Sequence, residues 1–95
     1  MKEADVAILM GSQSDLETMK ESALILKEFG VAFDIKVLST HRAPDDTAQY
    51  AQKLKSRGVK VVIAGAGGAA ALAGIVAAHT PIPVVGVPID RKSVV

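Results

Sequence analysis

The sequence has 95 residues, which fits one compact domain, so we expect residues 1–95 to fold around a single core. Eleven Lys and Arg nearly balance ten Asp and Glu, and no basic run predicts a nucleic-acid partner. The absence of cysteine excludes disulfides, thiolate chemistry and cysteine zinc sites, and it agrees with a reducing compartment.

The first part of the chain predicts a strand, a helix and a second strand. An apolar run at residues 5–10 ends at Gly11, which favours a fully buried strand. Over residues 16–29, apolar side chains recur at steps of three and four, which predicts an amphipathic helix that Gly30 ends. β-branched and aromatic residues at 31–38 predict the second strand.

The rest of the chain repeats this alternation. Pro44 with Asp45 and Asp46 opens a second helix, because proline fits a first helical turn and acids complement the positive helix N-terminus. Gly58 closes that helix. The following elements are a third buried strand at 59–64, a glycine turn at 65–70, an apolar helix at 69–79 and a fourth strand at 84–88.

The order βαβαβαβ predicts an α/β fold with a parallel sheet and right-handed crossovers. Two arrangements stay open, a flavodoxin-like strand order 2-1-3-4 and one half of a Rossmann fold. In both, the loops after the first three strands lie at the carboxyl edge of the sheet, where open parallel sheets bind ligands. The chain stops after four strands, so we expect other subunits or a longer protein to cover the rest of the sheet.

The segment 61–78 has no polar side chain and raises the question of a membrane span. Its clustered glycines at positions 65, 67 and 68 disfavour a continuous helix, and its small side chains contribute little transfer free energy. The N-terminus also lacks the basic start of a signal peptide. We therefore expect a cytoplasmic protein without a membrane partner.

The loop GSQSD, residues 11–15, follows the first strand. Gly11 permits a tight exit, Ser12 and Ser14 offer hydroxyls, and the first amides of the helix suit a phosphate. The alternative is ordinary capping of the helix by Ser14 or Asp15. Asp15 would repel a phosphate, so as a ligand contact it would meet ribose hydroxyls or a ring amine.

The loop STHRAP, residues 39–44, follows the second strand. The unperturbed pKa of a histidine lies near neutral pH, so His41 suits proton transfer in either direction. Arg42 offers a planar fork that matches phosphate or carboxylate, beside the hydroxyls of Ser39 and Thr40. The alternative is a solvated loop in which Arg42 pairs with an acid of the next helix.

The segment GAGGAA, residues 65–70, satisfies the pattern G-x-G-x-x-A, and Asp90 lies twenty residues beyond it. Both features mimic a dinucleotide fingerprint, although here the pattern follows the third strand and leaves His41 and Arg42 without a role. The alternative is close backbone packing. We interpret His79 as a residue at a helix C-terminus and Tyr50 and Met10 as packing residues, and we expect no metal site.

Four segments together resemble one family. They are MGSQSD at 10–15, STHRAPD at 39–45, IAGAGGAA at 63–70 and PVVGVP at 83–88. In this order and spacing they resemble the PurE family of purine biosynthesis, the N5-carboxyaminoimidazole ribonucleotide mutases of bacterial type. The resemblance implies a flavodoxin-like sheet, a homo-oligomer that is usually an octamer, a ribonucleotide substrate, and no metal or organic cofactor.

The resemblance also implies roles for residues. His41 is the general acid and base for moving a carboxylate from N5 to C4 of the aminoimidazole, and Ser12, Asp15 and Arg42 bind the ribonucleotide and its phosphate. The other expected substrate-binding residues lie in the same three loops: Gly11, Ser14, Ser39, Gly65, Ala66, Gly67 and Gly68. The glycines would let the backbone approach the ring and the trapped carbon dioxide.

The sequence departs from the family at three places. GGAAALAG has Ala71 and Ala73 where the bacterial class usually has a histidine and a proline, and Thr40 replaces a usual alanine. The family continues beyond GVP, so IDRKSVV predicts that the C-terminal part of the family fold is missing. Three alternatives remain: direct carboxylation of aminoimidazole ribonucleotide by carbon dioxide, a fragment that binds without turnover, and the dinucleotide-binding module.

Overall fold

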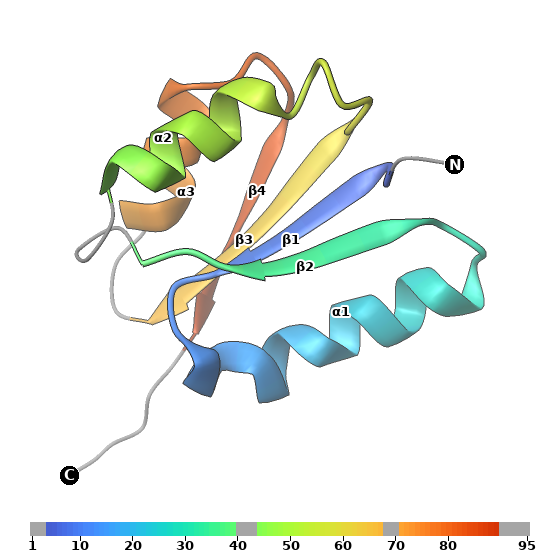
Figure 1. Ribbon diagram of the computed structural model, residues 1–95. Helices are drawn as coiled ribbons and strands as arrows, with labels where there is room; N and C mark the ends of the chain where they lie inside the picture. Colours follow the sequence, from blue (N-terminus) through green and yellow to red (C-terminus); the bar gives the residue numbers. More distant parts are fainter. Residues whose placement is uncertain (1–3, 40–43, 68–70, 90–95) are drawn as a thin grey trace, which may run out of the picture.

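A computed structural model of the chain shows a parallel sheet with helices on both faces (Figure 1). It describes residues 4–39, 44–67 and 71–89. The strands are β1 (Val6–Met10), β2 (Phe33–Val37), β3 (Val61–Gly67) and β4 (Val84–Ile89), in the order β2-β1-β3-β4 with parallel neighbours. The flavodoxin-like order is confirmed, and the Rossmann arrangement is wrong for these strands.

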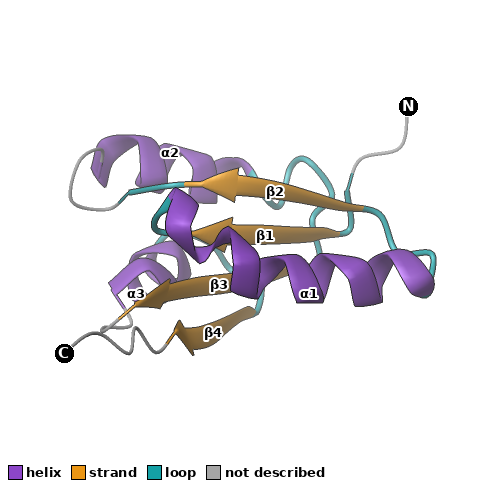
Figure 2. Ribbon diagram, turned by 90° about the horizontal axis from the view of Figure 1, so that it is seen from below, coloured by secondary structure: helices purple, strands orange, loops and turns teal. Residues whose placement is uncertain are grey.

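The helices form the two outer layers. The short 3-10 helix η1 (Gln13–Asp15) leads into α1 (Leu16–Glu28), which lies on one face of the sheet (Figure 2). The other face carries α2 (Pro44–Lys53) and α3 (Ala71–Ala78). Right-handed crossovers place consecutive helices on opposite faces wherever the strand order reverses, which happens after β2.

Two hydrophobic clusters fill the layers between the sheet and its helices. The cluster under α1 comprises Val6, Ile8, Met10, Met19, Ala23 and Ile89. The cluster under α2 and α3 comprises Ala7, Leu9, Leu38, Ala51, Leu54, Val59, Val62, Ala64, Leu72 and Val76. Successive residues of a strand face opposite sides, so β1 contributes to both clusters, and every one of its residues is buried. The predicted buried first strand is confirmed.

The α1 face of the sheet is only partly covered. Ile35 and Val37 on β2 are each 41% exposed, and Val85 on β4 is 51% exposed. Phe29, directly after α1, is 76% exposed. One helix cannot shield four strands, so apolar surface remains on both sides of α1, as expected for a sheet that needs further cover.

Gly30 ends the first helix as predicted, whereas Gly58 does not end the second. Gly30 has φ +72° and its N–H donates to the carbonyl of Lys27 at 3.1 Å, which closes α1. Gly58 has φ +86°, but α2 ends earlier, at Lys53, and a turned segment fills residues 54–58. The predicted end of the second helix was therefore five residues late.

The prediction of a glycine turn at 65–70 is wrong for its first half. β3 continues through Gly67, because Gly65 pairs with Met10 of β1 and Val87 of β4, and Gly67 pairs with Ile89 of β4. This strand pairing holds the glycines in the ladder and overrides their turn preference. The apolar segment 61–78 is thus divided between β3 and α3. In the described ranges, no helix has the length and apolar character needed to cross a membrane.

Candidate functional site

Two backbone hydrogen bonds align the carboxyl ends of three strands. The N–H of Gly11 donates to the carbonyl of Gly65 at 3.2 Å, and the N–H of Leu38 donates to the carbonyl of Met10 at 2.8 Å. The segments that leave β2, β1 and β3 therefore start side by side at one edge of the sheet (Figure 1). Among the predicted site residues, this edge gathers GSQSD, Ser39 and the first half of GAGGAA.

The first loop is organised by Ser12. Its backbone is extended, with φ −153°, and its Oγ accepts a hydrogen bond from the N–H of Ser14 at 3.2 Å. The N–H of Asp15 donates to the carbonyl of Ser12 at 3.0 Å, and the two serine Oγ atoms are 3.0 Å apart. The loop thus presents the hydroxyls of Ser12 and Ser14 as a pair, and Ser14 is exposed.

The predicted capping residue is corrected by this geometry. Ser12 caps η1, whereas Asp15 makes no side-chain capping hydrogen bond to α1. The reason is that the 3-10 helix η1 directly precedes α1. The first amides without a backbone partner therefore lie at the start of η1, three residues before α1, where Ser12 can cap them. Asp15 is only 3% exposed, so its carboxylate belongs to the interior of this edge and not to the open solvent.

The third loop begins inside β3. Ala66 and Gly67 are partly exposed at the end of the strand, whereas Gly65 is buried. A Cβ on Gly65 would overlap Met19 Sδ and would lie 3.1 Å from Ile89 Cδ1. At Gly65 the structure therefore favours the close-packing interpretation of the glycine motif over an opening for a ligand. A Cβ on Gly11 would lie 3.5 Å from the Cβ of Ala66, an ordinary contact.

Several predicted site residues lie outside the described residues. They are Thr40, His41 and Arg42 of the second loop, Gly68 of the third loop, and Asp90 of the dinucleotide interpretation. Ser39, the last described residue before the second loop, is half-buried directly after Leu38. The described structure therefore stops at Ser39 and resumes at Pro44, the first residue of α2.

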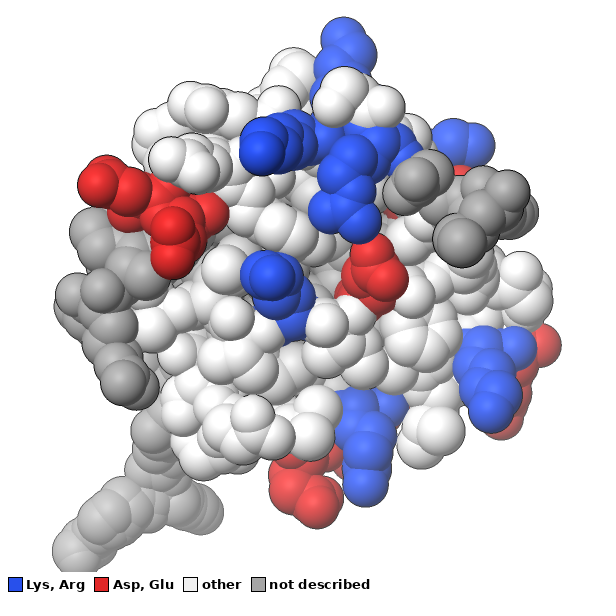
Figure 3. Space-filling model, viewed as in Figure 1, with Lys and Arg blue, Asp and Glu red and all other residues white. Residues whose placement is uncertain are grey.

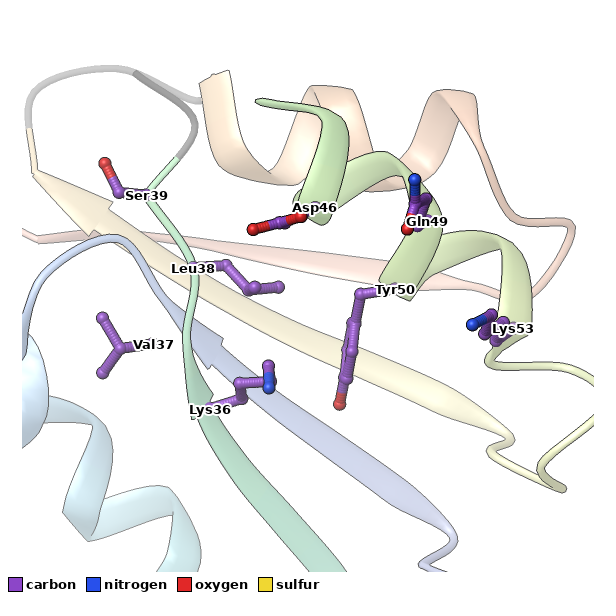
Figure 4. A pocket seen from close by; sticks show the side chains of 8 residues that line it. All are labelled: Lys36, Val37, Leu38, Ser39, Asp46, Gln49, Tyr50 and Lys53. Atoms are coloured by element: carbon purple, nitrogen blue, oxygen red, sulfur yellow. The ribbon is translucent and has the colours of Figure 1, made fainter. Parts of the chain in front are cut away.

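A cavity that the sequence did not predict lies between β2 and α2. Its volume is about 410 Å³. Figure 4 shows the side chains that line it: Lys36, Val37, Leu38, Ser39, Asp46, Gln49, Tyr50 and Lys53. Both signs of charge line it, and Figure 3 likewise shows basic and acidic side chains interspersed on this face. No sequence motif marks the cavity, because it arises where a strand and the next helix meet in space.

Tyr50 is the centre of the interactions beside this cavity. Lys36 Nζ lies 5.6 Å from the centroid of its ring and Arg57 Cζ lies 5.8 Å from it, both within the range of cation–π contacts. Arg57 also forms an ion pair with Asp34 at 3.2 Å. Burial raises the pKa of the Tyr50 hydroxyl, and the charge of Arg57 opposes that shift. Tyr50 packs as predicted, within a charged surround that the sequence did not indicate.

The ionisation of Tyr50 gives a testable pH dependence. Tyr50 is the chain's one tyrosine and there is no tryptophan, so the ultraviolet absorbance of tyrosinate reports this residue alone. We expect a midpoint above 10.0 in the folded chain and near 10 in urea. As pH rises, the unfolded state loses the Tyr50 hydroxyl proton before the folded state does. The free energy of unfolding should therefore fall as pH rises through about 10. The fall should be less steep in Tyr50→Phe, which lacks this proton. A folded midpoint at or below the urea value would contradict the burial argument.

The remaining titratable residues point to no metal site. Within residues 4–39, 44–67 and 71–89, no group of three His, Asp or Glu side chains is placed to hold a metal ion. His79 directly follows α3, and its Nδ1 lies 2.9 Å from the carbonyl of Ile75. His79 is therefore a residue at a helix C-terminus, as predicted, and it lies at the opposite end of α3 from the strand ends that form the candidate site.

The fold defines a class of protein, a flavodoxin-like α/β domain, in which the carboxyl edge of the sheet is the candidate ligand site. A family model, AIR carboxylase, matches residues 5–95. The chain belongs to the AIR carboxylase family. This membership gives no support to the dinucleotide interpretation of GAGGAA.

Individual relatives agree with the family. The chain is 56% identical over 88 residues to the N5-carboxyaminoimidazole ribonucleotide mutase of Pyrococcus horikoshii, covering 93% of this chain and 50% of the relative. It is also 56% identical over 88 residues to the phosphoribosylaminoimidazole carboxylase of Schizosaccharomyces pombe, covering 93% of this chain and 16% of the relative. The chain thus spans half the length of the first relative and less of the second.

A solved structure shows the same fold. The crystal structure of Treponema denticola PurE superimposes with a TM-score of 0.82 at 29% sequence identity, covering 88% of this chain and 54% of that one. The four strands and their helices therefore correspond to about half of a larger chain in that protein. The predicted PurE resemblance and the flavodoxin-like fold are both confirmed.

Proposed function

We propose that this chain acts as an N5-carboxyaminoimidazole ribonucleotide mutase in purine biosynthesis, folded as one domain over residues 1–95. The observation that carries the proposal is the alignment of three strand ends by the Gly11–Gly65 and Leu38–Met10 hydrogen bonds. This alignment brings GSQSD, Ser39 and the first half of GAGGAA to one edge, in a chain 56% identical to the Pyrococcus mutase.

The aligned loops supply complementary groups for a ribonucleotide. We assign the phosphate to Arg42 and to the hydroxyls of Ser12, Ser14 and Ser39, because hydroxyls and a guanidinium are strong donors to phosphate oxygens. An ionised carboxylate accepts hydrogen bonds and donates none, so we assign Asp15 to the hydrogen-bond donors of the ligand, the ribose hydroxyls or the ring amine. The backbone of Gly11, Ala66, Gly67 and Gly68 would border the aminoimidazole ring, whereas Gly65, an expected member of this set, packs against Met19.

His41 would carry the proton through both halves of the reaction. The imidazolium donates a proton to N5 as the N5–carbon bond breaks, which releases carbon dioxide and leaves a neutral amine. Carbon C4 of the ring then attacks the trapped carbon dioxide and forms the new carbon–carbon bond. The neutral imidazole removes the proton from C4, which restores both the aromatic ring and the imidazolium, so the reaction needs no cofactor.

A second candidate activity is direct carboxylation of aminoimidazole ribonucleotide with carbon dioxide. The observation that favours it is the equal identity, 56%, to the Schizosaccharomyces carboxylase. Ala71, which stands at the exposed start of α3, adds to this candidate because it replaces a histidine of the bacterial mutase motif. A third candidate, a fragment that binds the ribonucleotide without turnover, rests on the chain's half length relative to the mutase.

Initial rates with two substrates separate these candidates. The purified 95-residue chain would be given N5-carboxyaminoimidazole ribonucleotide without bicarbonate, or aminoimidazole ribonucleotide with bicarbonate, beside blanks without protein. The mutase proposal predicts the C4-carboxylated product from the first mixture above its blank. Product from the second mixture alone would assign the carboxylase activity. No product from folded chain in either mixture would leave only binding.

We also propose that the chain assembles into a homo-oligomer, an octamer by the family pattern, and acts in the cytoplasm. The exposed apolar residues beside α1, including Phe29 and Val85, support the assembly because such surface is unfavourable in water. The absence of cysteine is in keeping with a reducing compartment.

A further inference from the structure

We propose that Met19 is a positioning residue, which holds the first loop at a fixed spacing from the end of β3 by filling the place of a side chain at Gly65. The inference rests on the proposed function, because these two segments form facing parts of the proposed ribonucleotide site. It gives Gly65 a role in packing in place of the expected role in admitting the substrate.

Position 65 is a glycine because a side chain has no room there. A glycine is required either where φ is positive or where a Cβ has no room. Gly65 lies in an extended strand and is not among the glycines with positive φ, so the first reason does not apply. The second does, because a Cβ would overlap Met19 Sδ and lie 2.9 Å from Met19 Cε.

The space beside Gly65 is occupied by protein. Met19 is 1% exposed and belongs to the cluster under α1, together with Met10 and Ile89. Methionine is the side chain best suited to an irregular gap, because it is unbranched and its thioether is polarisable. The space left by the absent side chain of Gly65 is therefore filled by the Met19 thioether and is not open to a ligand at the carboxyl edge.

Gly65 is held from two directions by the same segment. Its carbonyl accepts the hydrogen bond from Gly11, and the position that a Cβ would take is filled by Met19. Asp15, the last residue of η1, directly precedes α1, and Met19 follows it by four residues in the first turns of that helix. A side chain at position 65 would push Met19 away and move the first turn of α1, and with it Asp15, relative to β3.

The experiment compares Gly65→Ala, Met19→Ala and the double variant with the unchanged chain. The first readout is the set of backbone amide NMR shifts of residues 11–15 without ligand, which does not depend on activity. We expect Gly65→Ala to displace these shifts and the double variant to return them toward the original values. If Gly65→Ala does not fold alone, folding of the double variant is the same rescue, and its failure to fold contradicts the inference.

The second readout is KM for the ribonucleotide in the assay above. The first loop carries proposed phosphate contacts, and a lost hydrogen bond to a charged group weakens binding at least about tenfold. We therefore expect Gly65→Ala to raise KM by at least about that factor and the double variant to recover most of it. Leu54→Ala, on the opposite face, should lower stability without raising KM, which separates positioning from general loosening.

Two results would overturn the inference. One is a Gly65→Ala variant whose residue 11–15 amides stay unchanged. The other is a double variant that folds with restored amides but keeps the high KM, because the substrate itself would then need the space at position 65. If the unchanged chain shows no turnover, the proposed function fails, and the amide shifts alone still decide whether Met19 sets the spacing.

Discussion

Replacing His41 by asparagine should lower kcat for N5-carboxyaminoimidazole ribonucleotide by about 10² to 10⁴-fold, the usual contribution of general acid–base catalysis. Asparagine retains the approximate reach and a hydrogen-bonding group of histidine but cannot accept or release a proton near neutral pH. The same imidazole serves both proton transfers in the proposal, so its loss should affect kcat and not substrate binding. We expect KM to stay within about threefold of the original value.

The other histidine of the chain provides a matched control. His79 lies after α3, where its Nδ1 is 2.9 Å from the carbonyl of Ile75, away from the carboxyl edge of the sheet. His79→Asn should retain kcat. Equal losses in the two variants would mean that histidine replacement acts through stability. A raised KM with unchanged kcat in His41→Asn would assign His41 to binding and remove it from proton transfer.

Replacing Leu54 by alanine should lower the free energy of unfolding by about 2 to 5 kcal/mol, the range for deleting a buried leucine side chain. Leu54 is 0% exposed and packs in the cluster that joins α2 and α3 to the sheet. Its carbonyl also accepts the N–H of Val59 at 3.1 Å, which fixes the turn into β3. Domains of this size have total stabilities of roughly 5 to 15 kcal/mol, so this variant loses a large part.

Urea unfolding at equilibrium measures this effect, with Leu24→Ala as the control. Leu24 is 56% exposed on α1, so the same substitution removes far less buried surface there. We expect the Leu24 variant to lose less than about 1 kcal/mol. A Leu54 variant as stable as the Leu24 variant would show that the packing around α2 contributes little to folding, contrary to the burial of Leu54.

The local sequence pattern was sufficient for most elements and for the location of the candidate site. The apolar run before Gly11 predicted β1, because a strand buried on both faces needs no polar alternation. The alternation of strands and helices then limited the sheet to two orders, and both brought the same loops together at the carboxyl edge. Gly30 marked the end of α1 correctly because its positive φ is a local property, whereas Gly58, also with positive φ, follows the end of α2 by five residues.

What the sequence could not predict depended on partners distant in the chain. β3 runs through Gly67 because β1 pairs with it as far as Gly65 and β4 pairs with it to the end, which no local preference of glycine reveals. The fit of Met19 against Gly65 joins two residues 46 positions apart. The cavity beside Tyr50 likewise needs β2 and α2 in place before it exists. A shift of the cap to Ser12 followed from a 3-10 turn that the helical periodicity did not mark.

The most direct test of the central claim, that the aligned strand ends of this chain bind a ribonucleotide, is a titration of the isotope-labelled chain with aminoimidazole ribonucleotide followed by amide NMR. We predict the largest shift changes at residues 11–15 and 65–67, reaching saturation together. Changes centred on Lys36 and Tyr50 would place the ligand in the cavity between β2 and α2. That result, or no change at millimolar ligand, would contradict a ribonucleotide site at the carboxyl edge of the sheet.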